Sequence, residues 1–284
     1  MSGELQLDRE GDSAWIIRRG DGAWLWRYVF DSAVPANEAP RPYAHPVLSP
    51  AGDLVTNFRP NDHSWHHALS LTITSVDGVN FWGGPSHRTA DGYQWRDDHG
   101  RQRHVAWQNT TAQRLEHTVE WADDRTKGVL LREQRELQTE LVEGGWSLRW
   151  TSRLTNVTNR ELSLGQYESL GGLRGSHYTG LQFRGARDLL DEHGDATLGI
   201  SDSAGRKGEA AVHGVESAAM EWSCQHDGSL RRTRIRFENL TGPLPWFVRQ
   251  KNPLAAFAFH RDRSVPLAAG ETLLLDHRLT FLFA

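Results

Sequence analysis

The 284-residue sequence contains a single cysteine, Cys224, and no long run of apolar residues. One thiol cannot form an intrachain disulfide, and it cannot supply a zinc site built from several cysteines. The longest apolar run covers residues 254–259, whereas about 20 such residues are needed to cross a bilayer. The N-terminal residues are polar and acidic and lack the apolar core of a signal peptide. We therefore expect a cytoplasmic protein that does not enter a membrane.

Clustered positive charge is also absent. The chain has 32 Lys and Arg against 36 Asp and Glu, which gives a net charge of −4. The only group of nearby arginines, within residues 231–236, has the spacing of a single strand. A nucleic-acid-binding protein usually carries a basic stripe or face. We therefore expect no nucleic acid among the partners.

Helical periodicity is missing, and many segments instead alternate between apolar and polar residues. Residues 14–19 and 23–30 are predicted to form two strands joined by a Gly-Asp-Gly turn. Segments 115–121 and 146–154 place their apolar residues on one face with a period of two, which is typical of antiparallel strands. We predict a single all-β domain over residues 1–284, with two large antiparallel sheets packed as a sandwich.

The sequence also predicts where the chain leaves these strands. Residues 31–52 contain five prolines, which disfavour a helix and predict a long extended loop. Residues 87–104 and 188–211 are mostly polar and are predicted to be loops as well. An Asp-Gly pair is expected to turn the strand at 68–76 back into a second strand at 79–82.

Histidines gather in one segment of the chain. Residues 41–87 hold five of the 14 histidines, together with several arginines and tryptophans. Core packing does not call for this mixture, because burying imidazole and guanidinium groups without partners costs free energy. The segment therefore predicts a functional site. The five histidines are His45, His63, His66, His67 and His87.

Two chemistries fit this segment. Imidazole titrates near neutral pH, so the favoured hypothesis is proton transfer by His45, His63 and His67, with Asp62 orienting one of them. The same spacing could supply two or three ligands to a divalent metal. Against a metal, strand alternation sends His66 and His67 to opposite faces, and the zinc motif His-Glu-x-x-His is absent. Each histidine could instead be structural, and the identity of any cofactor stays open.

Other side chains are candidates for holding a small ligand. Aromatic rings offer flat faces for stacking on a sugar, and arginines bind hydroxyl or carboxylate groups. Trp82 could instead belong to the core, and Arg59 and Arg184 could form ordinary surface ion pairs. The predicted substrate-binding residues are Arg41, Tyr43, Arg59, His66, Trp82, Glu168 and Arg184.

Several motifs resemble known families. The strings RPYAHPV (41–47), FRPNDHSWHHALSL (58–71) and GVNFWGG (78–84) resemble the PmoA-like family of uncharacterised bacterial proteins. The strings LTNVTNRELSLG (154–165) and PLAAGETLLLDHRLTF (266–281) look like the galactose mutarotase superfamily. The second resemblance implies a large β-sandwich with a concave sheet that binds a sugar or a sugar acid.

The predicted function combines these observations. We expect acid/base chemistry on a sugar or oxidised sugar, as an isomerase, an epimerase, a lyase or a hydrolase. One alternative is a sugar-binding or sensing module without catalysis. Another is a histidine-ligated metalloenzyme such as an oxygenase, as the PmoA-like name implies. Edge strands of the two sheets could also pair two copies into a homodimer.

Overall fold

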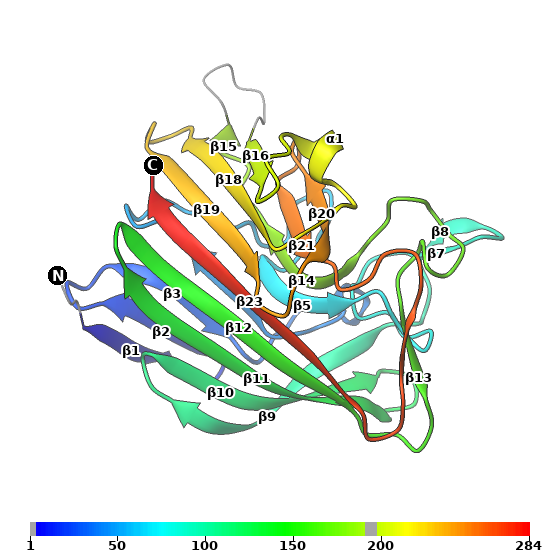
Figure 1. Cartoon of the computed structure of the whole chain (residues 1–284). Coiled ribbons are helices and arrows are strands. Elements are labelled where there is room, and N and C mark those ends of the chain that lie inside the picture. The colour runs from blue at the N-terminus through cyan, green and yellow to red at the C-terminus, as the bar shows by residue number, and fades with distance from the viewer. Residues whose placement is uncertain (1–3, 191–197) are drawn as a thin grey trace.

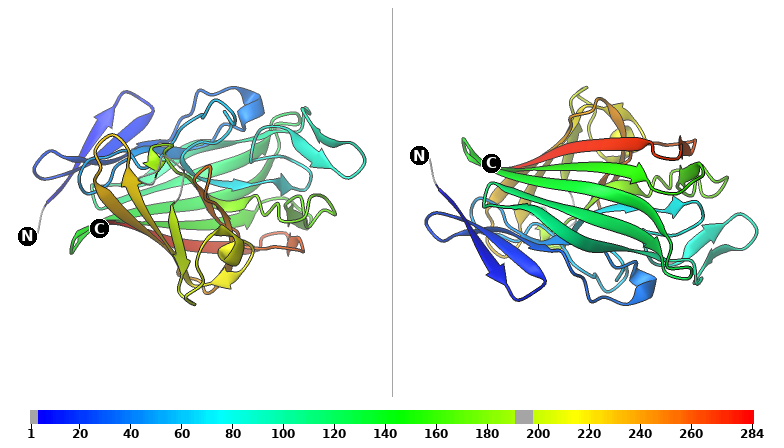
Figure 2. Two further views of the ribbon diagram at one scale, coloured as in Figure 1. Left: turned by 90° about the horizontal axis from the view of Figure 1, so that it is seen from above. Right: turned by 90° about the horizontal axis from the view of Figure 1, so that it is seen from below.

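Two large antiparallel sheets face each other in the computed structural model, which describes residues 4–190 and 198–284. The long strands of one sheet cross the front of Figure 1, and the other sheet lies behind them. Figure 2 shows the same two layers from above and from below. The all-β, two-sheet fold predicted from the sequence is confirmed.

The first sheet has nine strands in the order β1-β2-β3-β4-β5-β14-β21-β20-β17. Its middle joins segments that are far apart in the sequence, because β14 pairs with β5 on one side and with β21 on the other. The strands are β1 (Leu5–Glu10), β2 (Ala14–Arg19), β3 (Trp24–Val29), β4 (Tyr43–Val47), β5 (Leu69–Ile73), β14 (Thr179–Arg184), β17 (Glu216–Ser217), β20 (Leu244–Arg249) and β21 (Leu254–Phe257).

The second sheet follows the order β15-β18-β19-β23-β12-β11-β10-β9, with β16 paired to β18. It contains the longest strands of the molecule. The strands are β9 (Gly100–Thr110), β10 (Arg114–Asp123), β11 (Val129–Val142), β12 (Gly145–Asn156), β15 (Leu189–Leu190), β16 (Gly199–Asp202), β18 (Ala219–His226), β19 (Arg232–Asn239) and β23 (Thr272–Phe283).

The core lies between the two sheets because alternate residues of each strand point inward. In β12 the inward side chains Trp146, Leu148 and Trp150 are fully buried. Trp146 stacks on Phe281 of the neighbouring β23, with ring centroids 4.4 Å apart. These residues belong to one continuous apolar cluster between the sheets. Folding removes this cluster from water, which stabilises the protein by about 25 cal/mol for each Å² of apolar surface buried. This burial is the main stabilising contribution.

Smaller elements extend from the sandwich. A three-stranded sheet contains β6 (Ser75–Val76), β13 (Leu162–Gly165) and β22 (Val265–Leu267), and a hairpin pairs β7 (Ser86–Arg88) with β8 (Gly92–Gln94). The hairpin projects at the right of Figure 1. Over the described ranges, helix is confined to the 3-10 turn η1 (Ala36–Glu38) and the short helix α1 (Glu209–Val212).

Two strand predictions can be compared directly with the structure. The hairpin predicted for 14–19 and 23–30 is confirmed as β2 and β3, which pair from Ala14 with Val29. The strand predicted at 79–82 is wrong. Asp77 and Gly78 do have positive φ values, 54° and 87°, but β6 before this turn pairs with β13. The residues that follow the turn form an irregular segment.

The loop predictions were too broad. Residues 31–52 include η1 and β4. β4 tolerates Pro46, which lacks an N–H donor, because its register with β3 is shifted and it pairs with β5 only through Ala44 and Leu69. Residues 87–104 contain part of a hairpin and the start of β9. Segment 188–211 contains β15, β16 and part of α1, and its residues 191–197 lie outside the described residues.

No helix in residues 4–190 and 198–284 has both the length and the apolar character needed to cross a membrane.

Candidate functional site

An open cleft of about 480 Å³ lies on the outer face of the first sheet, away from the core. The strand periodicity explains its floor. In β20, Trp246 and Val248 join the core, whereas Phe247 and Arg249 point the other way and line the cleft. In β14, Phe183 points into the core and Arg184 lines the cleft.

Aromatic side chains form much of the cleft wall. Trp82 is nearly buried, and its ring centroid lies 5.3 Å from that of Tyr178 and 5.7 Å from that of His66. Burial raises the pKa of Tyr167, and its hydroxyl donates a hydrogen bond of 3.1 Å to the Pro85 carbonyl. The aromatic residues of the lining are Trp65, Trp82, Tyr93, Tyr167, Tyr178 and Phe247.

Trp65 is seated by two glycines of the irregular segment. Gly83 and Gly84 have φ values of 92° and 71°. A Cβ atom on Gly84 would lie 2.4 Å from ring carbons of Trp65. The positive φ and the close approach of the indole therefore both require glycine at position 84. The sequence string GVNFWGG thus shapes the cleft wall.

Two histidines stand side by side in the cleft. The rings of His63 and His66 are 4.9 Å apart. Burial, reinforced by the charge of Arg184, holds the pKa of His66 well below its usual range, so its imidazole is neutral at pH 7. His63 is more accessible, and its Nδ1 lies 3.3 Å from Oδ2 of Asp62. The pair combines a neutral imidazole with one that has a carboxylate neighbour.

Positive charge dominates the ionisable groups of the lining. Arg184, Arg249 and Lys251 carry three positive charges and Glu209 carries one negative charge, a net of +2 before the histidines are counted. The chain as a whole has a net charge of −4. The cleft is therefore a positive region on a negative protein, which favours anionic ligands.

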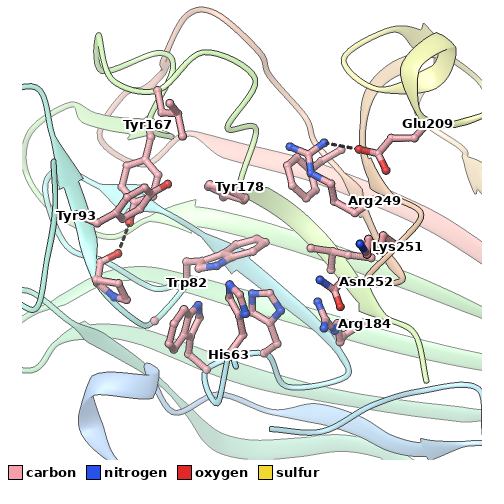
Figure 3. A pocket seen from close by; sticks show the side chains of 17 residues that line it. His63, Trp82, Tyr93, Tyr167, Tyr178, Arg184, Glu209, Arg249, Lys251 and Asn252 are labelled. Atoms are coloured by element: carbon pink, nitrogen blue, oxygen red, sulfur yellow. Dashed lines mark hydrogen bonds and ion pairs between the residues drawn. The ribbon is translucent and has the colours of Figure 1, made fainter. Parts of the chain in front are cut away.

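The three positively charged side chains differ in their contacts and in their burial. Arg249 lies 3.4 Å from Glu209, and its guanidinium carbon is 4.6 Å from the ring centroid of Phe247. Lys251 and Asn252 belong to the exposed turn between β20 and β21. Arg184 is buried at the floor and lies on the same side of the cleft as His63 in Figure 3.

A supporting network lies behind the cleft. His177 contacts Glu168 through Nδ1 and Oε2 at 3.2 Å, and its ring stacks on His213 at 5.2 Å. Nδ1 of His213 lies 3.0 Å from Nη1 of Arg249. Burial lowers the pKa of His177 to about 4. This network links the loop after β13 to Arg249.

Four of the predicted site residues line the cleft: His63, His66, Trp82 and Arg184. Asp62 lies directly beside it. Its carboxylate contacts His63 and forms an ion pair of 2.5 Å with Arg187. The histidine-rich segment therefore does contribute to the cleft, through fewer of its residues than expected.

Four predicted residues, three of them buried and His45 half-buried, do not line the cleft. The guanidinium of Arg41 donates to the carbonyls of Glu38, Ala39 and Trp65 and to the Ser70 hydroxyl. The hydrogen-bond partners of the Arg41 guanidinium therefore all belong to the protein itself. Tyr43 stacks on Phe58, His45 contacts the Thr56 hydroxyl, and Nε2 of His67 lies 3.3 Å from Oε2 of Glu38.

The contacts and pKa values of the predicted residues outside the cleft follow from their surroundings. Burial, with the charge of Arg27, lowers the pKa of His45 to about 4. Burial, with the charge of Arg41, lowers the pKa of His67 to about 3. Arg59 pairs with Glu38, and Glu168 accepts a hydrogen bond from the Gly175 amide and contacts His177. None of these side chains lines the cleft.

Sequence reasoning missed several lining residues from distant segments. Phe247 and Arg249 share a face of the WFVR strand, so a period of two could have paired them. Tyr93 lies in the three-residue strand β8 and Lys251 lies in a turn, and neither position carries a comparable pattern. No three or more His, Cys, Asp and Glu side chains in the described part of the chain are grouped so that they could hold a metal ion.

Comparison with known proteins gives a family and a set of structural likenesses. A family model described as "Family of unknown function (DUF6807)" matches residues 18–282. The PmoA-like resemblance is a different assignment, and it stays a prediction. A search of the curated proteins finds no match.

Solved structures with galactose mutarotase-like descriptions resemble the chain. One from Clostridium acetobutylicum is 12% identical, with a TM-score of 0.45 and coverage of 100% of this chain and 99% of the other. One from Lactobacillus casei is 9% identical, with a TM-score of 0.43 and coverage of 98% and 99%. A polysaccharide lyase is 11% identical with a TM-score of 0.41, and the chain spans 33% of its length. Likenesses at this level do not assign an activity.

Proposed function

Because the chain belongs to DUF6807, a family of unknown function, we propose its function from the cleft itself. The protein is a carbohydrate-active enzyme that binds a sugar or oxidised sugar and moves protons on it by acid/base catalysis. His63 is the proton-transfer group, Asp62 orients it, and His66 binds the substrate. The reaction is an isomerisation, an epimerisation, or a lyase or hydrolase step.

The observation that carries this proposal is the histidine pair within an aromatic cleft. A general acid or base must reach the substrate and titrate near neutral pH, and histidine does so without a large shift of its pKa. His63 is accessible, and its Nδ1 lies 3.3 Å from the Asp62 carboxylate, which can orient the ring. His66 is neutral, so it can donate or accept a hydrogen bond without adding charge.

The remainder of the lining supports a sugar as the ligand. A volume of about 480 Å³ falls in the range of small-molecule sites. Trp65, Trp82 and Tyr178 offer flat apolar faces, and the Asn252 amide offers directional hydrogen bonds. Sugars present the same combination of C–H faces and hydroxyl edges. His45 and His67 do not reach this space, so the proposal gives them no catalytic role.

Proton transfer can be tested directly. The purified protein would be incubated in D₂O with neutral hexoses, pentoses and their oxidised forms, and followed by ¹H NMR. Deuterium uptake at carbon, exchange between anomers, or new signals from cleavage would identify the reaction. We expect His63→Gln to slow the reaction by about 10²-fold or more with little change in sugar affinity. Trp65→Ala should mainly weaken binding.

The outcomes separate the alternatives. Full turnover in His63→Gln would remove His63 from the mechanism. Binding of sugars by the wild-type protein without any turnover would favour the sugar-binding or sensing module instead. Absence of binding to every sugar tested would reject the carbohydrate assignment as a whole.

A further inference from the structure

Three arginines are almost completely buried, and they differ in how their N–H groups are satisfied. Arg41 donates to three carbonyls and one hydroxyl. Arg135 makes two bonds of 2.7 Å to Glu133 and further bonds to Tyr28 and Gln102. Both guanidinium groups are held by the protein itself, as expected for buried charges.

Arg184 is the exception. It is 2% exposed, yet its Nε and Nη2 atoms have no hydrogen-bond partner among the described residues. Its nearest carboxylate is Asp62, whose Oδ1 lies 3.9 Å from Nη2, which is too long for a hydrogen bond. Asp62 is already paired with Arg187 at 2.5 Å. A buried guanidinium with two free donors is costly unless a ligand supplies the acceptors.

Arg184 belongs to the lining of the cleft. It lies near His63 in Figure 3, and its charge contributes to the lowered pKa of His66. Two residues earlier on the same face of β14, the buried Gln182 also has both amide atoms without a partner. Gln182 does not itself line the cleft, whereas Arg184 does, so a molecule bound in the cleft could supply the acceptors that Arg184 lacks.

We propose that the ligand of this cleft carries a carboxylate and that Arg184 binds it. Nε and Nη2 lie on one edge of the planar guanidinium, which matches the two oxygens of a carboxylate. The inference rests on the proposed function and narrows its substrate to acidic sugars, such as uronic or aldonic acids. Arg184 is then the residue that discriminates an acidic sugar from its neutral counterpart.

Two neighbours strengthen the preference for an anion. Lys251 has no ion pair among the described residues and stands at the cleft rim with Asn252, near Arg184 in Figure 3. Arg249 is already paired with Glu209. A single free guanidinium fork fits one carboxylate, and no glycine-rich loop of amides is present in the lining to cradle a phosphate. The cleft therefore favours a carboxylate over a phosphate group.

Matched ligand pairs test the inference by isothermal titration calorimetry. Hexuronates would be compared with their parent hexoses, aldonates with the corresponding alditols, and hexose 6-phosphates with both. Acetate would show whether a carboxylate binds without a sugar. We expect an acidic sugar to bind at least about tenfold more tightly than its neutral counterpart, as one charge-assisted contact provides. Its affinity should fall as NaCl is added.

Variants locate the effect. Arg184→Gln should abolish the preference for the acidic sugar over its neutral counterpart. Arg153→Gln, an exposed residue on the outer face of β12, makes the same change of net charge and should retain the preference. If Arg184→Gln fails to fold, the test uses the wild type and the exposed variant Lys251→Gln. A preference of the wild type for acidic sugars that is partly lost in Lys251→Gln would then support the proposal, and equal affinities of the wild type for acidic and neutral sugars would overturn it.

The failure of this inference is distinct from failure of the proposed function. Equal affinities for acidic and neutral sugars in every pair would overturn the proposal that the ligand carries a carboxylate, but not the proposal that the cleft binds a sugar. Tightest binding of the 6-phosphates, or a preference that survives in Arg184→Gln, would also overturn it. Absence of any sugar binding would reject the proposed function together with the inference.

Discussion

Glu38 and Arg59 form a two-contact ion pair, with Oε1 to Nη2 at 2.8 Å and Oε2 to Nε at 2.9 Å. The pair ties η1 to the histidine-rich segment. Burial alone would raise the pKa of Glu38, but hydrogen bonds from His67, Arg59 and Ser64 outweigh it and lower the pKa to about 2. This carboxylate therefore holds Arg59 and His67, which the sequence analysis had predicted to bind a substrate or act on it.

Replacing Glu38 should destabilise the fold. Glu38→Gln removes the negative charge opposite Arg59 and weakens the contact with His67, and we expect a loss of about 2 kcal/mol in the free energy of unfolding. Urea denaturation at pH 7 measures it. Asp8→Asn, which breaks the exposed pair of Asp8 with Arg18, serves as the control and should cost no more than about 1 kcal/mol. Equal losses in both variants would contradict the structural role of Glu38.

Buried neutral histidines should make the fold sensitive to mild acid. Burial lowers the pKa of His277 to about 3, below the usual value near 6.5. The unfolded state therefore binds a proton that the folded state does not, and stability falls as the pH drops below about 6.5, until it approaches the folded pKa. Between pH 7 and pH 5 one such group costs about 2 kcal/mol.

The contribution of His277 can be isolated. Unfolding free energies at pH 7 and pH 5 would be compared for the wild type and His277→Gln. The variant loses packing on Phe257 at both pH values, but it should lose less additional stability between them. A difference between pH 7 and pH 5 as large as that of the wild type would show that His277 does not cause the acid sensitivity.

The buried pair of Glu133 and Arg135 offers a test in the core. Glu133 also accepts hydrogen bonds from Ser152 at 2.6 Å and from Trp121 at 2.8 Å. Glu133→Gln leaves the Arg135 charge uncompensated and should cost about 3–5 kcal/mol. The double variant Glu133→Leu with Arg135→Met removes both charges and should recover much of that loss in urea denaturation. A double variant less stable than Glu133→Gln would refute this account.

Glycine at position 84 should matter for binding as well as for stability. Gly84 and Gly144 have φ values of 71° and 74°, but only Gly84 approaches another group, the Trp65 ring. Backbone strain should cost about 1–2 kcal/mol for alanine at either position, and the clash with Trp65 should add to the cost at position 84. Only Gly84→Ala should also weaken sugar binding, because it displaces Trp65 from the cleft wall. Calorimetric affinities that are equal in the two variants would contradict this placement of Trp65.

Much of the fold could be predicted because it depends on local patterns. Period-two alternation identified the buried face of β12, and an Asp-Gly pair identified the turn at Asp77. The prediction failed where pairing partners decide the outcome. Residues 79–82 have strand-like composition but form only isolated bridges, from Val79 to Val76 and from Asn80 to His99. Pro46 enters β4 because the neighbouring register leaves room for it.

The candidate site divides in the same way. The sequence by itself determined that imidazoles, aromatic rings and arginines gather in residues 41–87, and that His66 and His67 must meet different surroundings. Only the tertiary structure decided which of them share a cleft. The order β5-β14-β21-β20 brings His66, Arg184 and Phe247 together on one outer face, although they are far apart in the chain. Strand order depends on the packing of the whole sandwich, so it cannot be predicted from a local sequence pattern.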